Sequence, residues 1–187
     1  MKRVNAVFLD RDGTINEEVE YLSRLEDLRL FPNTGEAIGL INRSGMKAVV
    51  VTNQSGVARG FFDEAFLELL HDRISDMLAE KGAHIDRFYY CPHHPTEGRG
   101  KYRRDCYCRK PKPGMFQEAA RDLHIDLASS YMIGDNQTDM EAALNAGVRG
   151  ILVRTGYGKT ADRPEHASYR ASDILDAVQW ILRDQGR

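Results

Sequence analysis

The 187-residue sequence has no long hydrophobic run, few cysteines and almost no excess charge. No apolar stretch approaches the roughly 20 residues that a membrane-spanning helix needs. The N-terminal segment reaches Asp10 too early to hold the apolar core of a secretory signal. We therefore expect a cytoplasmic protein that has no membrane partner.

The formal net charge is only -2, with 42% hydrophobic and 29% charged residues. This balance is typical of a globular domain, and it provides no general attraction to nucleic acid or to an anionic membrane. No internal repeat is visible. The length is enough for one hydrophobic core, so we expect a monomer with a single domain over residues 1–187.

The few cysteines are clustered. Cys91, Cys106 and Cys108 lie in a segment that is rich in Pro, Gly, Arg and Lys and nearly devoid of aliphatic residues. In a reducing compartment such a cluster indicates a metal site more than a disulfide. Together with His93 it offers three thiolates and one imidazole, which is a closed ligand set for structural Zn2+, although the one-residue gaps are tighter than usual.

The stretch that indicates chemistry is the apolar run 6–9, which ends at Asp10 and Asp12 with Gly13 behind them. It predicts a buried strand with two carboxylates at its carboxyl end, and Mg2+ would relieve the repulsion between them. A carboxylate can attack a phosphate whose charge a metal screens, so we assign Asp10 as nucleophile and Asp12 as proton donor and acceptor. By itself the pattern is equally typical of a loop-capping aspartate before a glycine.

The remaining chain alternates between strand and helix patterns. A loop over residues 15–32 precedes a helix that Asn33 or Thr34 would cap. Asp63 would cap a long helix that ends near Lys81. The inner stripe of this helix is predicted at Phe66, Leu69, Leu70, Ile74, Met77 and Leu78. Further strands are predicted at 46–51, 85–90, 130–135 and 150–153, and further helices at 114–124, 138–145 and 172–182.

This alternation predicts an α/β fold with a Rossmann-like parallel sheet and helices on both faces. Ligands of such sheets bind at the carboxyl ends of the strands, where Asp10, Thr52 and Asp135 are all expected. Thr52 and Asn53 can hold phosphate oxygens, and Lys110 can offset the charge of the transition state.

Asp135 would complete a Mg2+ ligand set with Asp10 and Asp12, and Asp139 would support it one helical turn later. Taken singly, Thr52-Asn53 is also typical of a helix cap, and Lys110 of an exposed charge. The ordered combination is more specific than any of its parts.

That combination resembles the haloacid dehalogenase superfamily of aspartate-nucleophile phosphatases, through the motifs at 10–14, 52–53, 110–111 and 134–135. Within this superfamily, the chain resembles the heptose bisphosphate phosphatases over essentially its whole length. The motifs that carry this resemblance lie at 8–16, 52–60, 90–95 and 108–111. The resemblance implies Mg2+-dependent release of the C7 phosphate through an aspartyl-phosphate. It also implies a place in ADP-heptose and lipopolysaccharide core synthesis. No large insertion follows the first strand or lies between Gly82 and Lys110, so we expect a fold without a large cap domain.

The resemblance also assigns residues. It implies a zinc loop at about 91–108, with the ligands Cys91, His93, Cys106 and Cys108. The substrate-binding positions would be Asp10, Arg11, Asp12, Glu18, Val19, Glu20, Tyr21, Thr52, Asn53, Gln54, Ser55, Arg109 and Lys110. Asn136 is a departure, because some relatives carry a lysine there.

Two alternatives remain open at this stage. Histidinol-phosphate phosphatases share the architecture and the zinc loop, and their substrate presents the same kind of phosphate ester. The basic residues of the zinc loop are also compatible with a nucleic-acid-binding module. A bisphosphate substrate explains these charges more economically, because its second phosphate also needs a partner. The remaining histidines, His71, His84, His94, His124 and His166, are assigned no role.

Overall fold

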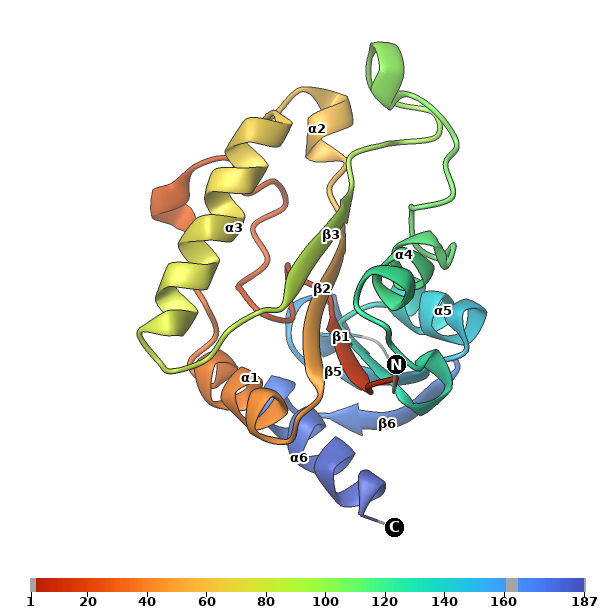
Figure 1. The fold of residues 1–187 in the computed structure, drawn as a ribbon. Coiled ribbons are helices and arrows are strands. Elements are labelled where there is room, and N and C mark those ends of the chain that lie inside the picture. Colours follow the sequence, from red (N-terminus) through yellow and green to blue (C-terminus); the bar gives the residue numbers. More distant parts are fainter. Residues whose placement is uncertain (1–2, 161–164, 187) are drawn as a thin grey trace.

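The computed structural model describes residues 3–160 and 165–186, which form one six-stranded parallel sheet with strand order β3-β2-β1-β4-β5-β6 (Figure 1). The strands are β1 (Ala6–Leu9), β2 (Lys47–Asn53), β3 (Arg87–Cys91), β4 (Tyr131–Gly134), β5 (Arg149–Val153) and β6 (Ala167–Ala171). The helices are α1 (Thr34–Arg43), α2 (Gly56–Arg59), α3 (Glu64–Ala79), α4 (Gly114–Asp122), α5 (Gln137–Ala146) and α6 (Ile174–Gln185). The predicted Rossmann-like fold is confirmed.

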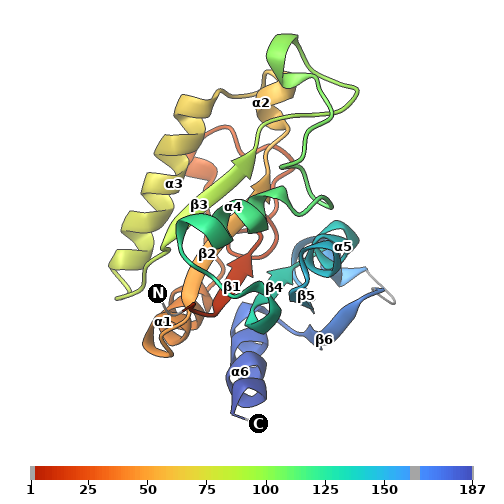
Figure 2. The same ribbon diagram turned by 45° about the vertical axis from the view of Figure 1, so that its right-hand side comes forward.

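The sheet lies between two helical layers, with α1, α3 and α6 on one face and α4 and α5 on the other (Figures 1 and 2). The position of β1 between these two layers explains why its sequence is apolar throughout. Val7 and Leu9 point into the core of the first layer, and Ala6 and Phe8 point into the core of the second. A strand that is buried on both faces needs a continuous apolar run.

Long segments follow β1 and β3, and they contain few regular elements. Only a 3-10 turn at Leu25–Asp27 lies between β1 and α1, and only one at Gly100–Tyr102 lies between β3 and α4. The second segment extends beyond the carboxyl end of the sheet in both views (Figures 1 and 2). As predicted, the described part of the chain places loops, and no large cap domain, over this edge.

Two predictions about α3 and α1 were wrong in detail. In α3, Leu69 is 57% exposed and Leu67 is buried instead, because the apolar stripe drifts around the helix. Asp63 caps α3 as predicted, since its side chain accepts a hydrogen bond from the Phe66 amide. No side-chain hydrogen bond caps α1, and the Asn33 Nδ2 instead donates to Asp173 (3.0 Å).

Two elements were not predicted. α2 is only four residues long, and β6 is an edge strand whose alternating small and polar residues resemble a loop. Both are formed by tertiary context, since β6 pairs with β5 and so extends the sheet to six strands.

Candidate active site

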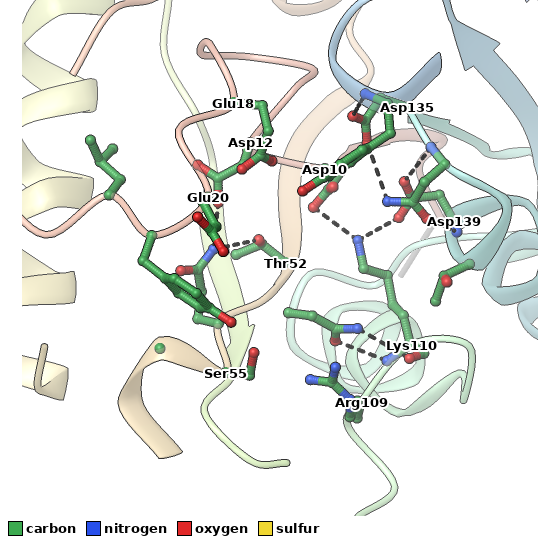
Figure 3. Close-up of a pocket in the computed structure, with 18 of the residues that line it drawn as sticks. Asp10, Asp12, Glu18, Glu20, Thr52, Ser55, Arg109, Lys110, Asp135 and Asp139 are labelled. Atoms are coloured by element: carbon green, nitrogen blue, oxygen red, sulfur yellow. Dashed lines mark hydrogen bonds and ion pairs between the residues drawn. The ribbon is translucent and has the colours of Figure 1, made fainter. Parts of the chain in front are cut away.

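The carboxyl ends of β1, β2 and β4 surround a cavity of about 410 Å³, which the loop after β1 and the segment before α4 also line (Figure 3). Asp10, Thr52 and Asp135 all line it, as their strand positions predict. The other predicted site residues that line it are Asp12, Glu18, Glu20, Tyr21, Asn53, Gln54, Ser55, Arg109 and Lys110. Arg11 instead lies buried behind Asp12, and Val19 is 40% exposed outside the lining.

Lys110 is at the centre of the charged groups. Its side chain is 2% exposed, and its Nζ donates to Asp10 Oδ1 (2.9 Å) and to Asp139 Oδ1 (2.6 Å), as Figure 3 shows. Burial lowers the pKa of this ammonium, but the charges of Asp10 and Asp139 raise it by more, so its pKa lies above the ordinary value. Lys110 is therefore a fixed positive charge, and the reading of it as an exposed surface lysine does not apply.

Three buried aspartates form an acidic group. Asp10, Asp135 and Asp139 each offer a carboxylate oxygen, and these oxygens lie within 4.8 Å of one another. Burial, then the charge of Asp10, raises the pKa of Asp135 to about 8, and burial raises that of Asp139 to about 6 although Lys110 opposes the rise. A hard divalent cation relieves such repulsion, so the donor set fits Mg2+.

Asp12 is not part of this group. Its carboxylate accepts hydrogen bonds from Arg11 Nη2 (2.7 Å), Asn16 Nδ2 (2.9 Å) and Gln54 Nε2 (2.8 Å). Burial raises the pKa of Asp12, but the Arg11 charge and these hydrogen bonds lower it by more, so the carboxyl ionises below its usual range. A carboxylate held in this way is oriented for proton transfer, and its oxygens already have partners.

Asn53 contacts Lys110 through the main chain. Its Oδ1 accepts from the Lys110 amide (3.0 Å), and its Nδ2 donates to the Lys110 carbonyl (3.1 Å). Sequence reasoning placed the Asn53 side chain on a phosphate oxygen, whereas in the structure both of its polar atoms hold the lysine segment against the end of β2.

Glu18 lies on the loop after β1, beside the two motif aspartates. Burial, then the charges of Asp12 and Asp10, raises its pKa to about 7. Glu18 and Glu20 both line the cavity, so this side of the site presents carboxyl oxygens that can accept hydrogen bonds from hydroxyl groups.

Sequence reasoning missed one part of the site, the turn Gly156–Lys159 after β5. The Tyr157 amide donates to Asp135 Oδ2 (2.8 Å), and the Thr155 hydroxyl donates to the Gly13 carbonyl (2.5 Å). A Cβ added to Gly13 or to Gly156 would lie 2.0 Å from Asp135 Oδ2, and both glycines have positive φ. The sequence does contain an indication of this turn. The segment T-G-Y-G follows a predicted strand, as other glycine-containing segments follow the other predicted strands.

Asn136 also contacts the acidic group. Its side chain accepts from the Asp139 amide (3.2 Å), which caps α5, and its Nδ2 donates to Asp135 Oδ1 (3.2 Å). At this position the chain thus has a neutral residue that contacts both aspartates.

The predicted cysteine and histidine residues also come together. Their Sγ and Nδ1 atoms are separated by 3.3 to 3.7 Å in the pairs that are in contact. The members are Cys91, His93, Cys106 and Cys108. A tetrahedron with such edges has its centre about 2.1 Å from each corner, near the length of a zinc–ligand bond. The four atoms therefore fit Zn2+.

Direct contacts hold this loop against the helices. Glu64 at the start of α3 accepts from Tyr102 (2.5 Å) and from Tyr90 (2.8 Å), and Arg59 of α2 pairs with Glu97 (2.7 Å). The loop thus rests on the helices that follow the Thr52 strand end, and it leads directly into Lys110.

Comparison with known proteins matches these observations to a family. A family model described as HAD-hydrolase-like matches residues 107–181. D-glycero-beta-D-manno-heptose-1,7-bisphosphate 7-phosphatase of Haemophilus ducreyi is 44% identical over 94% of this chain and 97% of that protein. The chain belongs to this family of phosphatases. The Escherichia coli K12 member of the family is 42% identical over 98% of this chain and 97% of its own length.

A solved structure of the family agrees. The D,D-heptose 1,7-bisphosphate phosphatase of B. bronchiseptica, crystallised with magnesium and phosphate, superposes with a TM-score of 0.85. It is 33% identical and covers 97% of this chain and 99% of that one. This member of the family is accordingly a phosphoric monoester hydrolase with a haloacid dehalogenase-like fold. Among its described residues, no helix is long and apolar enough to cross a membrane.

Proposed function

We propose that this phosphatase removes the C7 phosphate of D-glycero-beta-D-manno-heptose 1,7-bisphosphate, in ADP-heptose and lipopolysaccharide core synthesis in the cytoplasm. The proposal depends above all on the ion pair between Asp10 and the buried Lys110, at the bottom of an open cleft. The names of the closely similar relatives support the substrate.

In the proposed mechanism a carboxylate oxygen of Asp10 attacks phosphorus, and the bond from phosphorus to the leaving sugar oxygen breaks. Asp12 is ionised at rest, but the negative charge of the bound phosphate raises its pKa, so it takes up a proton from solvent and gives it to that oxygen. Water then attacks the aspartyl-phosphate, Asp12 takes the proton of the water, and phosphate leaves. Lys110 offsets the negative charge on the phosphoryl group throughout.

Mg2+ would be held by Asp10 and Asp135, with Asp139 or Asp12 completing its oxygen ligands, and it would screen the phosphate charge when bound. The Thr52 hydroxyl faces the same cavity and can donate to a phosphate oxygen. Zn2+ on the four cysteine and histidine ligands would have no open coordination position. Its role would be to hold the loop that leads into Lys110.

The other end of the substrate also has candidate partners. Arg109 lines the cavity, and one of its nitrogens donates to the His93 carbonyl (3.1 Å), so its guanidinium is held beside the cleft. It is suited to the phosphate that is not cleaved. Glu18 and Glu20 can accept hydrogen bonds from sugar hydroxyls. Four further residues would support the reacting end of the substrate or form the rim of the cavity, namely Arg11, Tyr21, Gln54 and Ser55. Val19, outside the cavity lining, would act only through its backbone.

The decisive experiment measures phosphate release from both anomers of heptose 1,7-bisphosphate, with histidinol phosphate and an RNA oligonucleotide tested in parallel. We expect kcat/KM to be highest for a heptose bisphosphate, with Mg2+ required and C1 phosphate retained. Asp10→Asn should abolish turnover while the unfolding midpoint changes little, and Asp12→Asn should lower turnover by orders of magnitude. Higher kcat/KM on histidinol phosphate, or full activity of Asp10→Asn, would reject the proposal.

A further inference from the structure

Gln54 lies in the cavity lining, between Thr52, which is expected to hold phosphate, and Asp12, which is expected to transfer protons. It is 4% exposed and immediately follows the end of β2. Its Nε2 donates to Asp12 Oδ2 (2.8 Å) and to Thr52 Oγ1 (2.9 Å), and its Oε1 accepts from Arg11 Nη2 (3.1 Å). Both amide hydrogens and the amide oxygen therefore have partners.

The neighbours allow only one orientation of this amide. A guanidinium can only donate, so the oxygen of Gln54 must face Arg11. An ionised carboxylate can only accept, so the nitrogen must face Asp12. The second hydrogen of that nitrogen then points at Thr52 Oγ1. Flipping the amide would place oxygen against carboxylate and nitrogen against guanidinium.

This orientation determines what the Thr52 hydroxyl can do. A hydroxyl has one hydrogen to donate, and because Oγ1 accepts from Gln54, that hydrogen is directed elsewhere. Among the hydrogen bonds of the described residues, Thr52 Oγ1 is never the donor. Thr52 lines the cavity beside Asp10, as Figure 3 shows, so the free hydrogen is available to an oxygen of a bound phosphate.

We propose that Gln54 is a positioning residue that makes the Thr52 hydroxyl a donor toward the phosphate and holds Asp12 beside it. The inference rests on the proposed function and assigns Gln54 a role behind the reacting groups, without direct contact with the sugar. A carboxylate at position 54 would reverse the effect, because it would accept the Thr52 hydrogen and repel Asp12. A thioether of similar length would only remove the two donated bonds.

The first test compares Gln54→Glu with Gln54→Met. We expect kcat/KM to fall about 10-fold in Gln54→Met and about 100-fold or more in Gln54→Glu. The larger loss is comparable to removing one hydrogen-bond donor from a charge that develops in the transition state. A residue that only fills space would give the opposite order, since glutamate is closer in shape to glutamine. Equal or higher activity in Gln54→Glu overturns the proposal.

The second test is a double-mutant cycle between positions 54 and 52, with the Kd of inorganic phosphate in the presence of Mg2+ as the readout. Gln54→Met should weaken phosphate binding several-fold in the wild type and in Thr52→Ser, which keeps the hydroxyl. In Thr52→Val, which lacks it, the same change should have no further effect. An equal loss in Thr52→Val overturns the proposal.

Asn16→Ala is the matched control, because Asn16 donates to the other oxygen of Asp12 and has no hydrogen bond to Thr52. Its effect on phosphate binding should be the same with serine or valine at position 52. Phosphate binding does not depend on which sugar is the substrate, so the cycle stays informative even if heptose bisphosphate is not hydrolysed. If Gln54→Met does not fold, Gln54→Leu, which also lacks both amide hydrogens, replaces it in both tests.

Discussion

At the scale of single residues, hydrogen-bond partners distinguish residues that meet the substrate from residues that position others. Thr52, Asn53 and Gln54 are consecutive, and sequence reasoning placed all three on the substrate. In the structure, Asn53 holds the main chain of Lys110, and Gln54 holds the Thr52 and Asp12 side chains. The same short motif can therefore organise the lysine, the proton-transfer carboxylate and the hydroxyl.

Asn53→Asp tests the contact with Lys110. The variant keeps an acceptor for the Lys110 amide but loses the donor to its carbonyl, and its negative charge faces that carbonyl. We expect kcat to fall at least 10-fold, with a smaller change in KM, because the Lys110 ammonium shifts relative to Asp10. Steady-state kinetics measures both constants.

Asn145→Ala is the control for this change. Asn145 is exposed, and its Nδ2 donates to the carbonyl of Pro111, the next residue along the same segment (2.9 Å). It should retain activity within about twofold and lose about 1 kcal/mol of unfolding free energy at most. Equal losses of kcat in the two variants would show that Asn53 has no special role.

At the scale of elements, two loops bring the site together. The turn after β5 approaches Asp135 so closely that only glycine fits at position 156, where φ is +48°. The loop before α4 carries His93, Cys106 and Cys108 and then Lys110, which follows Cys108 by two residues. Each loop can be disturbed separately.

Gly156→Ala should displace the Asp135 carboxylate. We expect the Mg2+ concentration for half-maximal activity to rise at least 10-fold, because Asp135 belongs to the proposed ligand set. Gly147→Ala is the matched control, since Gly147 also has positive φ (+72°) but no neighbour within 4 Å of an added Cβ. It should lose stability by about 1 kcal/mol and keep its Mg2+ dependence. A shared change in Mg2+ requirement would point to general destabilisation.

Loss of zinc should disturb catalysis through Lys110. We expect the purified protein to contain one zinc ion per chain. Cys106→Ser should lose this ion, and its kcat should fall at least 10-fold. Added Mg2+ should not restore kcat. Metal analysis and kinetics on the same sample measure both. His94→Gln, next to the ligand set but outside it, should keep its zinc. A zinc-free variant with normal turnover would contradict the proposed role.

At the scale of the whole molecule, His71 links the stability of the core to pH. It is 6% exposed and stacks on Phe88, and its Nε2 has no hydrogen-bond partner. Burial, then the charge of Arg11, lowers its pKa from 6.5 to about 3, although Asp12 opposes the shift. The folded protein therefore excludes a proton that the unfolded chain binds.

The free energy of unfolding should decrease as the pH falls. Because the pKa is lowered in the folded state, the stabilisation is complete above pH 6.5 and is lost as the pH falls toward 3. In this window His71 contributes a slope of about 1.4 kcal/mol per pH unit to the free energy of unfolding. Urea unfolding at several pH values should show a shallower slope for His71→Leu. An unchanged slope in His71→Leu would contradict this role.

The sequence by itself determined the main elements and the polar strand ends. Apolar runs such as 6–9, and helical periodicity such as that of α3, report burial through local patterns. Because the strands are parallel, their carboxyl ends share one edge, and the convergence of Asp10, Thr52 and Asp135 followed from their positions after strands. The clustering of three cysteines with His93 was likewise visible in the chain.

Only the tertiary structure decided which atoms are partners. Asp10 and Lys110 are 100 residues apart, so no local pattern predicts that their side chains meet, or that Asp139 is the second partner of the lysine. The glycine turn at 156, the pairing of β6 and the orientation of the Gln54 amide likewise depend on distant neighbours. Local sequence sets the tendency to form an element, whereas the choice of partner depends on which groups the folded chain brings within hydrogen-bond distance.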